Sequence, residues 1–182
     1  MASSILRYLK SEGVQETEVL EVGGGIGAVQ VELLKAGAAR SVNVELSSGY
    51  EEAAKLLADE EGVSDRVERQ TGDFVEVQDE VKAADIVVMN RVVCCYPWME
   101  RLLGAAVVKT GRYLALVFPR EKWWVKTGLV LGNSYMALRK VAFRSFVHPV
   151  DEIEALVTSA GFEVRHTDHN FIWQAVVMER VA

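Results

Sequence analysis

Short apolar runs alternate with stretches of helical spacing along most of the chain. Apolar residues that run together or alternate with polar ones predict strands at 19–22, 41–45, 67–70, 84–89 and 113–118. Apolar residues that recur on one helical face, with charges on the other, predict helices at 28–35, 51–60 and 97–108. Strands that alternate with helices in this way form a parallel sheet covered by helices on both faces.

The last part of the chain ends this alternation. A capped helix stopped by a glycine is predicted at 151–160, and two strands are predicted at 163–166 and 172–178. Because only a few residues around Asp168 join these two strands, they must be antiparallel. The sequence therefore predicts a single α/β domain over residues 1–182, with a doubly wound, seven-stranded, mostly parallel sheet and an antiparallel last strand.

Residues 119–148 interrupt the order between the fifth predicted strand and the next helix. These 30 residues carry six basic side chains against one acidic one, and five of the 15 aromatic side chains of the chain. A simple strand-to-helix loop takes roughly 2–6 residues. We therefore expect a helical insertion at the carboxyl edge of the sheet, the edge at which open α/β folds bind their ligands.

The overall composition is that of an ordinary globular chain. The 20 basic and 26 acidic side chains give a formal net charge of −6, which argues against nucleic acid as a partner. The two cysteines are adjacent in sequence, so nothing indicates an oxidising compartment. The chain shows no signal-peptide pattern, and no run approaches the roughly 18 apolar residues of a membrane-spanning helix. We expect a cytoplasmic protein that is not inserted in a membrane.

A glycine-rich loop follows the first predicted strand and opens the first predicted helix. Gly23, Gly24, Gly25 and Gly27 allow the backbone to turn tightly and to approach a ligand closely. The helix that follows presents free N–H groups and the positive end of its dipole. Glu45 ends the second strand 20 residues after Gly25, where its carboxylate can accept both hydroxyls of a ribose. This combination predicts a cofactor that contains adenosine.

Two such cofactors fit the loop. The G-x-G-x-x-A spacing over residues 23–28 also satisfies the dinucleotide fingerprint, so NAD stays open at this point. Two acidic positions favour S-adenosylmethionine (SAM). Glu21 lies two residues before the first glycine, where it can face a cationic amino-acid group. Asp73 can accept from an adenine amino group while Phe74 covers the ring.

Together with the antiparallel last strand, these features resemble the class I SAM-dependent methyltransferases over nearly the whole chain. That family has a Rossmann-like sheet of seven strands, and the E-x-G-x-G-x-G sequence at 21–27 is the most specific local element of the resemblance. The resemblance implies an enzyme that uses SAM as its cofactor.

The loop at 90–97, Asn-Arg-Val-Val-Cys-Cys-Tyr-Pro, resembles more narrowly the magnesium-protoporphyrin O-methyltransferases and related bacterial proteins. The sequences at 123–124 (Trp-Trp) and 147–149 (Val-His-Pro) look like the same group. The resemblance implies that the start of the loop lines the methionine end of SAM and that the insertion forms a lid over the substrate. The residues expected to bind SAM are then Glu21, Gly23, Gly24, Gly25, Gly27, Glu45, Leu46, Asp73, Phe74, Asn90, Arg91 and Val92.

Two departures from that group bear on the substrate. Trp98 stands where the family loop usually carries an acidic residue. Only 20 residues precede Glu21, where the group usually has several tens that help to cover the cofactor. Either this cover is missing, or a partner or the lid replaces it.

Methyl transfer depends on alignment and on exclusion of water more than on acid or base catalysis. A carboxylate acceptor needs no general base, whereas a hydroxyl or an amine can need one. Tyr96 and His148 are the two candidate catalytic residues, since one precedes the proline of the loop and the other ends the insertion. Both also have a structural interpretation, as packing or capping side chains.

Two other groups of reactive side chains are interpreted structurally. His166, Asp168 and His169 belong to a polar turn, and we expect no metal site there. Cys94 and Cys95 have no histidine near them in sequence, and we expect them to pack as small buried side chains.

The sequence thus predicts a SAM-dependent methyltransferase that methylates a small molecule, at oxygen, on a flat or apolar acidic substrate. In the lid, cations would hold acidic groups while Trp123 or Trp124 stacks on the substrate. The insertion can also be a solvated helix, or a basic helix that contacts a membrane surface. Two other functions stay open: an NAD-dependent oxidoreductase, and a non-catalytic SAM-binding subunit that needs a partner.

Overall fold

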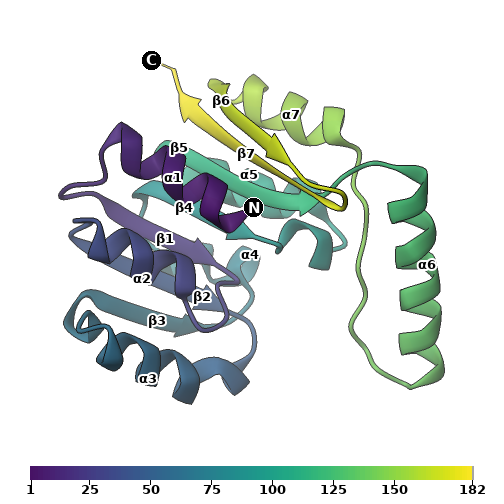
Figure 1. Ribbon diagram of the computed structural model, residues 1–182, viewed down its shortest axis with the longest axis horizontal. Coiled ribbons are helices and arrows are strands. Elements are labelled where there is room, and N and C mark those ends of the chain that lie inside the picture. Colours follow the sequence, from purple (N-terminus) through teal and green to yellow (C-terminus); the bar gives the residue numbers. More distant parts are fainter. Residues whose placement is uncertain (182) are drawn as a thin grey trace.

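Seven strands form one sheet in the order β3-β2-β1-β4-β5-β7-β6 (Figure 1). The computed structural model describes residues 1–181. The strands are β1 (Glu18–Val22), β2 (Arg40–Glu45), β3 (Val67–Thr71), β4 (Ala84–Asn90), β5 (Thr110–Pro119), β6 (Phe162–His169) and β7 (Trp173–Arg180). The first five strands are parallel, and β7 is antiparallel to both of its neighbours, β5 and β6. The predicted seven-stranded, mostly parallel sheet is confirmed.

Helices cover both faces of the sheet, as the strand–helix alternation predicts. One face carries α1 (Ala2–Glu12), α2 (Ala28–Lys35) and α3 (Glu51–Glu60), and the other carries α4 (Phe74–Val77), α5 (Met99–Lys109) and α7 (Val150–Ser159) (Figure 1). Each layer of helices packs on its face of the sheet around a separate hydrophobic core. Leu9 and Leu33 pack in the first core, whereas Leu103 and Ile153 pack in the second. Burial of such side chains is the main favourable term in folding.

The hydrophobic pattern of the sequence predicts the bounds of some helices and strands well and those of others poorly. The bounds of α2 and α3 agree with the predicted 28–35 and 51–60 residue for residue. The sequence analysis predicts no helix at α1, although Ile5 and Leu9 recur at helical spacing and pack in the first core. It also predicts β6 too short, because β6 is an edge strand with mostly exposed side chains.

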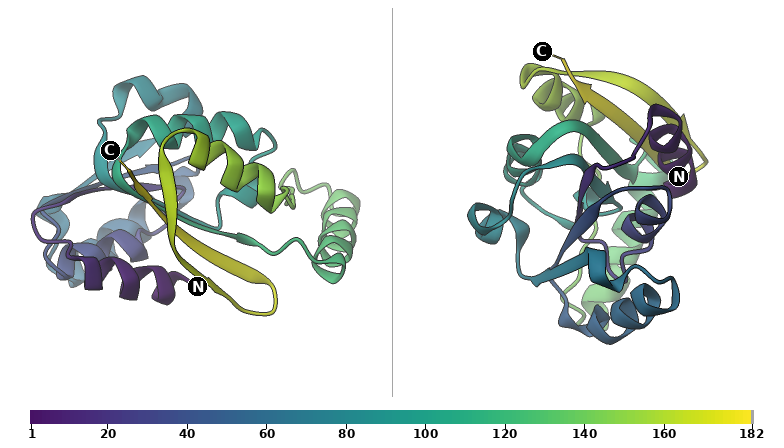
Figure 2. Two further views of the ribbon diagram at one scale, coloured as in Figure 1. Left: turned by 90° about the horizontal axis from the view of Figure 1, so that it is seen from above. Right: turned by 90° about the vertical axis from the view of Figure 1, so that its left-hand side faces the viewer.

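The insertion at 119–148 contains one helix, α6 (Trp123–Leu138), which stands apart from the sheet in Figure 1 and in the left-hand view of Figure 2. The chain then runs back to α7 as an extended stretch, the return segment (139–149). The side-chain amide of Asn133 donates to the carbonyl oxygen of Ser145 at 2.7 Å, and the N–H of Ser145 donates to Asn133 Oδ1 at 2.9 Å. These two bonds hold the return segment against α6.

Candidate functional site

A cavity of about 410 Å³ opens at the carboxyl ends of β1, β2 and β4. The order of the strands reverses between β1 and β4, and open α/β sheets bind their ligands at such a switch point. The cavity collects eight of the twelve residues that the sequence predicts for the cofactor. They are Gly23, Gly25, Glu45, Leu46, Asp73, Phe74, Arg91 and Val92.

Gly23 and Gly24 of the glycine loop have no room for a side chain. Gly23 has φ 62°, and a Cβ there would lie 2.6 and 3.0 Å from the two methyl groups of Val92. A Cβ on Gly24 would lie 2.6 Å from both Asn43 Nδ2 and the carboxyl carbon of Glu21. The backbone of these glycines therefore packs directly against Val92 on one side and against Asn43 and Glu21 on the other.

Glu45 holds this loop from the neighbouring strand. Its Oε2 accepts a hydrogen bond from the N–H of Gly25 at 2.9 Å, and its Oε1 accepts one from the N–H of Ser47 at 2.9 Å. The side chain is 8% exposed and lines the cavity. A carboxylate has about four acceptor positions, so Glu45 keeps capacity for two further donors.

Glu21 lies elsewhere than the sequence analysis expects. It is 1% exposed, it does not line the cavity, and its Oε2 accepts the N–H of Gln30 at the start of α2 at 3.0 Å. Burial raises the pKa of Glu21 to about 7, against the opposing effects of the Gln30 bond and of Arg69. Glu21 therefore supports the glycine loop from beneath instead of facing a ligand, because its side chain points from β1 into the first helix layer.

The raised pKa of Glu21 gives a stability prediction. The folded chain holds a proton on Glu21 up to about pH 7, whereas an unfolded chain releases it near the ordinary value of 4.5. Stability from this group is therefore fully present below about pH 4.5 and is lost as the pH rises through about 7. Glu21→Gln, which cannot ionise, is expected to remove this slope in urea unfolding measured across that window. An equal slope in both proteins would contradict the assignment.

Asp73, Tyr96 and His148 form one connected group at the cavity. The hydroxyl of Tyr96 donates to Asp73 Oδ2 at 3.0 Å, and burial together with this bond raises the pKa of Tyr96. Nε2 of His148 lies 2.9 Å from the carbonyl oxygen of Tyr96, so this nitrogen is the donor. Tyr96 lines the cavity and His148 does not. Both candidate catalytic side chains are thus engaged in bonds that position the loop after β4.

The start of that loop holds three predicted residues in different ways. Arg91 has φ 64°, donates its N–H to Val117 O at 2.9 Å, and lies with its guanidinium 4.8 Å from the ring centre of Trp173. Val92 packs against Gly23, and both residues line the cavity. Asn90 lies outside the cavity lining, but its buried Oδ1 has no hydrogen-bond partner. An unpaired buried acceptor is costly, so Asn90 is suited to receive a donor from a bound molecule.

The cysteines follow the sequence prediction only in part. Cys94 is buried, as expected, but Cys95 is exposed and lines the cavity. The two sulfur atoms lie 3.7 Å apart within the 3₁₀ turn at Val93–Cys95, with Cys95 on the side of the cavity.

The tryptophans of the insertion are not at the cavity, contrary to expectation. Trp124 stacks on Phe171 in the turn between β6 and β7, with ring centres 5.4 Å apart, and Trp123 is exposed. Phe143 of the return segment and Tyr50 after β2 line the cavity instead. The aromatic content of the insertion signals Phe143 only as one of several candidates. Nothing in the sequence singles out Tyr50.

The histidine-containing stretch at the end of β6 is part of the fold. His166 Nε2 lies 2.9 Å from Ser4 Oγ, and the His166 ring stacks on Tyr8 with centres 5.0 Å apart. Within residues 1–181, no three His, Cys, Asp or Glu side chains gather as a metal site would require.

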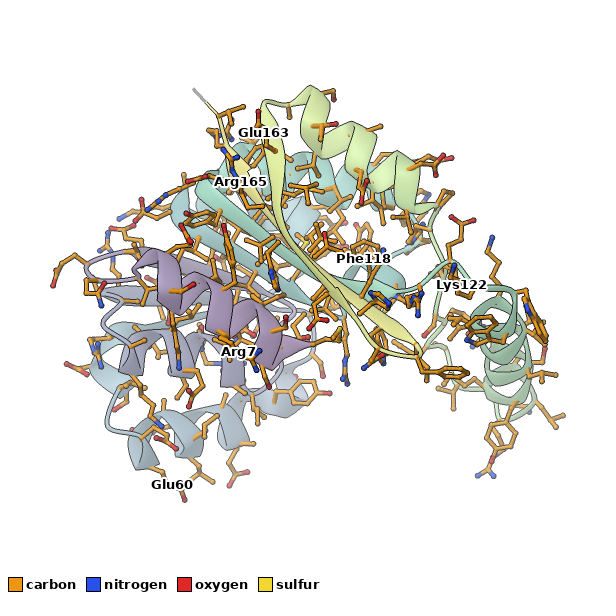
Figure 3. All side chains as sticks on the ribbon, turned by 45° about the horizontal axis from the view of Figure 1, so that its top comes forward. Arg7, Glu60, Phe118, Lys122, Glu163 and Arg165 are labelled. Atoms are coloured by element: carbon orange, nitrogen blue, oxygen red, sulfur yellow. The ribbon has the colours of Figure 1, made fainter. Side chains whose placement is uncertain are left out.

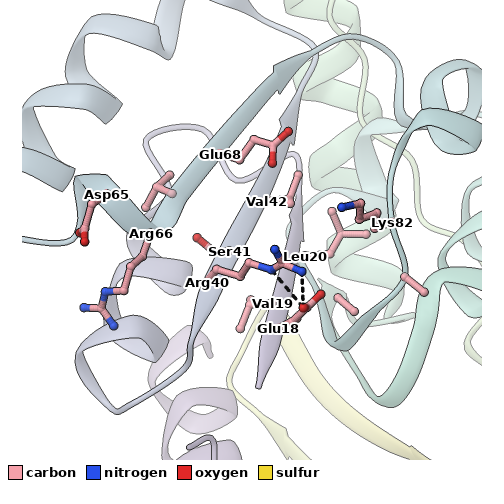
Figure 4. Close-up of a pocket in the computed structure, with 13 residues that line it drawn as sticks. Glu18, Val19, Leu20, Arg40, Ser41, Val42, Asp65, Arg66, Glu68 and Lys82 are labelled. Atoms are coloured by element: carbon pink, nitrogen blue, oxygen red, sulfur yellow. Dashed lines mark hydrogen bonds and ion pairs between the residues drawn. The ribbon is translucent and has the colours of Figure 1, made fainter. Parts of the chain in front are cut away.

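A second, smaller hollow of about 170 Å³ lies at the opposite edge of the sheet, near the amino ends of β1, β2 and β3 (Figure 4). Charged side chains surround it, and Arg40 is paired with Glu18 across it. Ligands of open α/β sheets bind at the other edge, so the cavity at the carboxyl ends of β1, β2 and β4 is the candidate site.

Comparison with known proteins places this geometry in context. Residues 20–114 match the family model described as Methyltransferase domain. The chain is 28% identical over 126 residues to protein arginine N-methyltransferase 6 of Danio rerio, a match that covers 68% of this chain and 32% of the relative. The chain therefore spans about a third of the length of the curated relatives that it matches.

Solved structures share the fold at low identity. The chain superposes on a magnesium protoporphyrin IX methyltransferase from Synechocystis PCC 6803 with a TM-score of 0.81 at 17% identity, covering 99% of this chain and 82% of the other. An O-methyltransferase family protein from Burkholderia thailandensis gives a TM-score of 0.75 at 17% identity, with 98% and 56% covered. At these identities the similarity establishes the fold.

Proposed function

Because the chain belongs to the methyltransferase-domain family, we propose that it transfers a methyl group from SAM to a small molecule. The observation that carries this proposal is the cavity at the switch point, in which a glycine loop and Glu45 lie side by side. Its volume of about 410 Å³ is that of a small-molecule site.

The residues at the cavity fit SAM part by part. Glu45 would accept the ribose hydroxyls with the acceptor positions that Gly25 and Ser47 leave free. Asp73 would accept from the adenine amino group, beside Phe74.

SAM supplies a methyl group on a positively charged sulfur, ready for in-line displacement by a nucleophile. Positioning alone can account for roughly 7–11 kcal/mol of such a barrier. The chain contributes alignment through the glycine loop and exclusion of water through the return segment, from which Phe143 reaches the cavity.

The positions of Tyr96 and His148 favour a carboxylate as the acceptor. The hydroxyl of Tyr96 donates to Asp73, and His148 does not line the cavity. A carboxylate carries no proton that must be removed before it attacks. We therefore propose methylation at oxygen, with the side chains of this loop acting as positioning residues.

The lining of the cavity favours an apolar, acidic substrate over an arginine side chain. Among the described residues that line it, Glu45 and Asp73 are the carboxylates, and both are assigned to the cofactor. Arg91 is the cation. A guanidinium acceptor would thus find no free carboxylate, whereas a flat acid would meet aromatic side chains and a positive charge.

Calorimetric titration of the purified chain with SAM, its demethylated product and NAD tests the cofactor. We expect micromolar binding of the first two and none of NAD. Binding of NAD alone would replace the proposal with a dehydrogenase. If none of the three compounds binds, and a partner protein restores the binding of SAM, the chain is better described as a non-catalytic SAM-binding subunit.

A separate methyl-transfer assay tests the acceptor. Transfer of radiolabelled methyl to a flat aromatic carboxylic acid is expected, with none to the matching amide and none to an arginine-containing peptide. Labelling of the peptide alone would shift the substrate class from a small molecule to a protein.

A further inference from the structure

The outer face of α6 is apolar and uncovered. Five large side chains on it are between 61% and 80% exposed: Trp123, Val130, Leu131, Tyr135 and Leu138. At 3.6 residues per turn these positions form one continuous stripe along the helix. We call it the α6 outer face. A contiguous apolar patch of this kind on a protein surface marks a binding surface.

The polar side chains within the stripe are already satisfied. The hydroxyl of Thr127 donates to Trp123 O at 2.9 Å, and that of Ser134 donates to Val130 O at 2.8 Å. Burial of a hydroxyl costs free energy mainly when it loses its partner. The α6 outer face can therefore enter an apolar medium without leaving these two groups unpaired.

The fold does not use this face. On the opposite side of α6, Val125 is buried and Asn133 exchanges two hydrogen bonds with Ser145 of the return segment. The helix projects beyond the rest of the molecule, with side chains that extend away from the sheet (Figures 2 and 3).

The charge around α6 is opposite to that of the rest of the chain. Residues 119–148 hold six basic side chains and one acidic one, which leaves 14 basic and 25 acidic side chains elsewhere. No Asp or Glu occurs from 122 to 150. Lys122 lies at the N-terminal end of α6 (Figure 3), and Arg139 and Lys140 follow its C-terminal end. The apolar stripe is thus bracketed by cations.

We propose that the α6 outer face docks on an anionic lipid surface, with the helix lying in the plane of the interface. Apolar side chains that include a tryptophan would enter the boundary between headgroups and acyl chains, while the bracketing cations pair with the headgroups. The projection of α6 holds the acidic remainder of the chain away from the negative surface. Within residues 1–181 no helix is long and apolar enough to cross a bilayer, so this contact is peripheral. The inference is independent of the methyl transfer.

Sedimentation with vesicles tests this directly. The chain is expected to bind vesicles that contain phosphatidylglycerol, to bind pure phosphatidylcholine vesicles far more weakly, and to be released by salt. The triple variant Val130→Ser, Leu131→Ser, Leu138→Ser should weaken binding at least about tenfold. The matched control is Leu56→Ser with Val108→Ser, since both residues are exposed apolar side chains on other helices. It should bind like the unmodified chain.

Three outcomes would overturn the proposal. The unmodified chain does not sediment with anionic vesicles; or the triple variant sediments as well as the unmodified chain; or gel filtration shows a dimer that the triple variant loses, with no vesicle binding. The last outcome assigns the face to a second copy of the chain. Because the substituted side chains are exposed, unchanged melting temperatures are expected and show that each variant is folded.

Discussion

Replacing Glu45 with alanine is expected to weaken the binding of SAM by about 10- to 100-fold. The carboxylate accepts the N–H groups of Gly25 and Ser47, which fixes the glycine loop, and it is the proposed acceptor for the ribose hydroxyls. A hydrogen bond to a charged group contributes about 1.5–3 kcal/mol, which corresponds to the expected loss of affinity. Calorimetric titration with SAM measures it.

Two further variants separate binding of the ribose from support of the loop. Glu45→Gln keeps one acceptor oxygen but loses the charge, so an intermediate affinity is expected. Glu68→Ala removes an exposed carboxylate of β3 at the opposite edge of the sheet, beside the smaller hollow, and should leave affinity unchanged. If Glu45→Ala binds SAM as tightly as the unmodified chain, the ribose lies elsewhere.

Replacing Gly23 with alanine is expected to destabilise the fold by about 2–4 kcal/mol. Two costs combine at this position. A left-handed backbone costs an alanine about 1–2 kcal/mol, and Gly23 has φ 62°. The new methyl group would also lie 2.6 Å from a methyl of Val92, a contact that the stiff, β-branched side chain cannot escape by bending. Urea unfolding measures the loss.

Gly25→Ala is the matched control for this contact. Gly25 also has a left-handed backbone, φ 57°, but a Cβ there would meet nothing nearer than the Tyr50 ring at 3.8 Å. It should therefore show the conformational cost alone, about 1–2 kcal/mol. Combining Gly23→Ala with Val92→Ala should recover the steric part. Equal losses in Gly23→Ala and Gly25→Ala would show that the Val92 contact relaxes freely.

The sequence predicts best what neighbouring residues determine. The helices α2 and α3 have one apolar face and clear end signals, so their bounds follow from spacing alone. The sequence also predicts where the glycine loop, Glu45 and Asp73 lie. Each stands at or just after the end of a strand, and the carboxyl ends of parallel strands meet at one edge of the sheet.

What the sequence does not predict depends on side-chain direction and on distant contacts. Glu21 and Glu45 both stand near the carboxyl ends of neighbouring strands, yet only the structure shows that one points beneath the loop and the other into the cavity. The bonds of Tyr96 to Asp73 and of His148 to Tyr96 join residues 23 and 52 positions apart. No local pattern carries such pairings, and they fix how Tyr96 and His148 are held.

Two backbone acceptors tie the return segment to the loop after β4. The N–H of Phe146 donates to Cys94 O at 2.7 Å, and His148 donates to Tyr96 O at 2.9 Å. The same loop carries Val92 and Tyr96 into the cavity. A ligand that shifts this loop therefore also shifts the segment above it. When one ligand binds to this loop and another binds to the return segment, thermodynamic linkage requires each to change the affinity of the other by the same factor, whichever binds first.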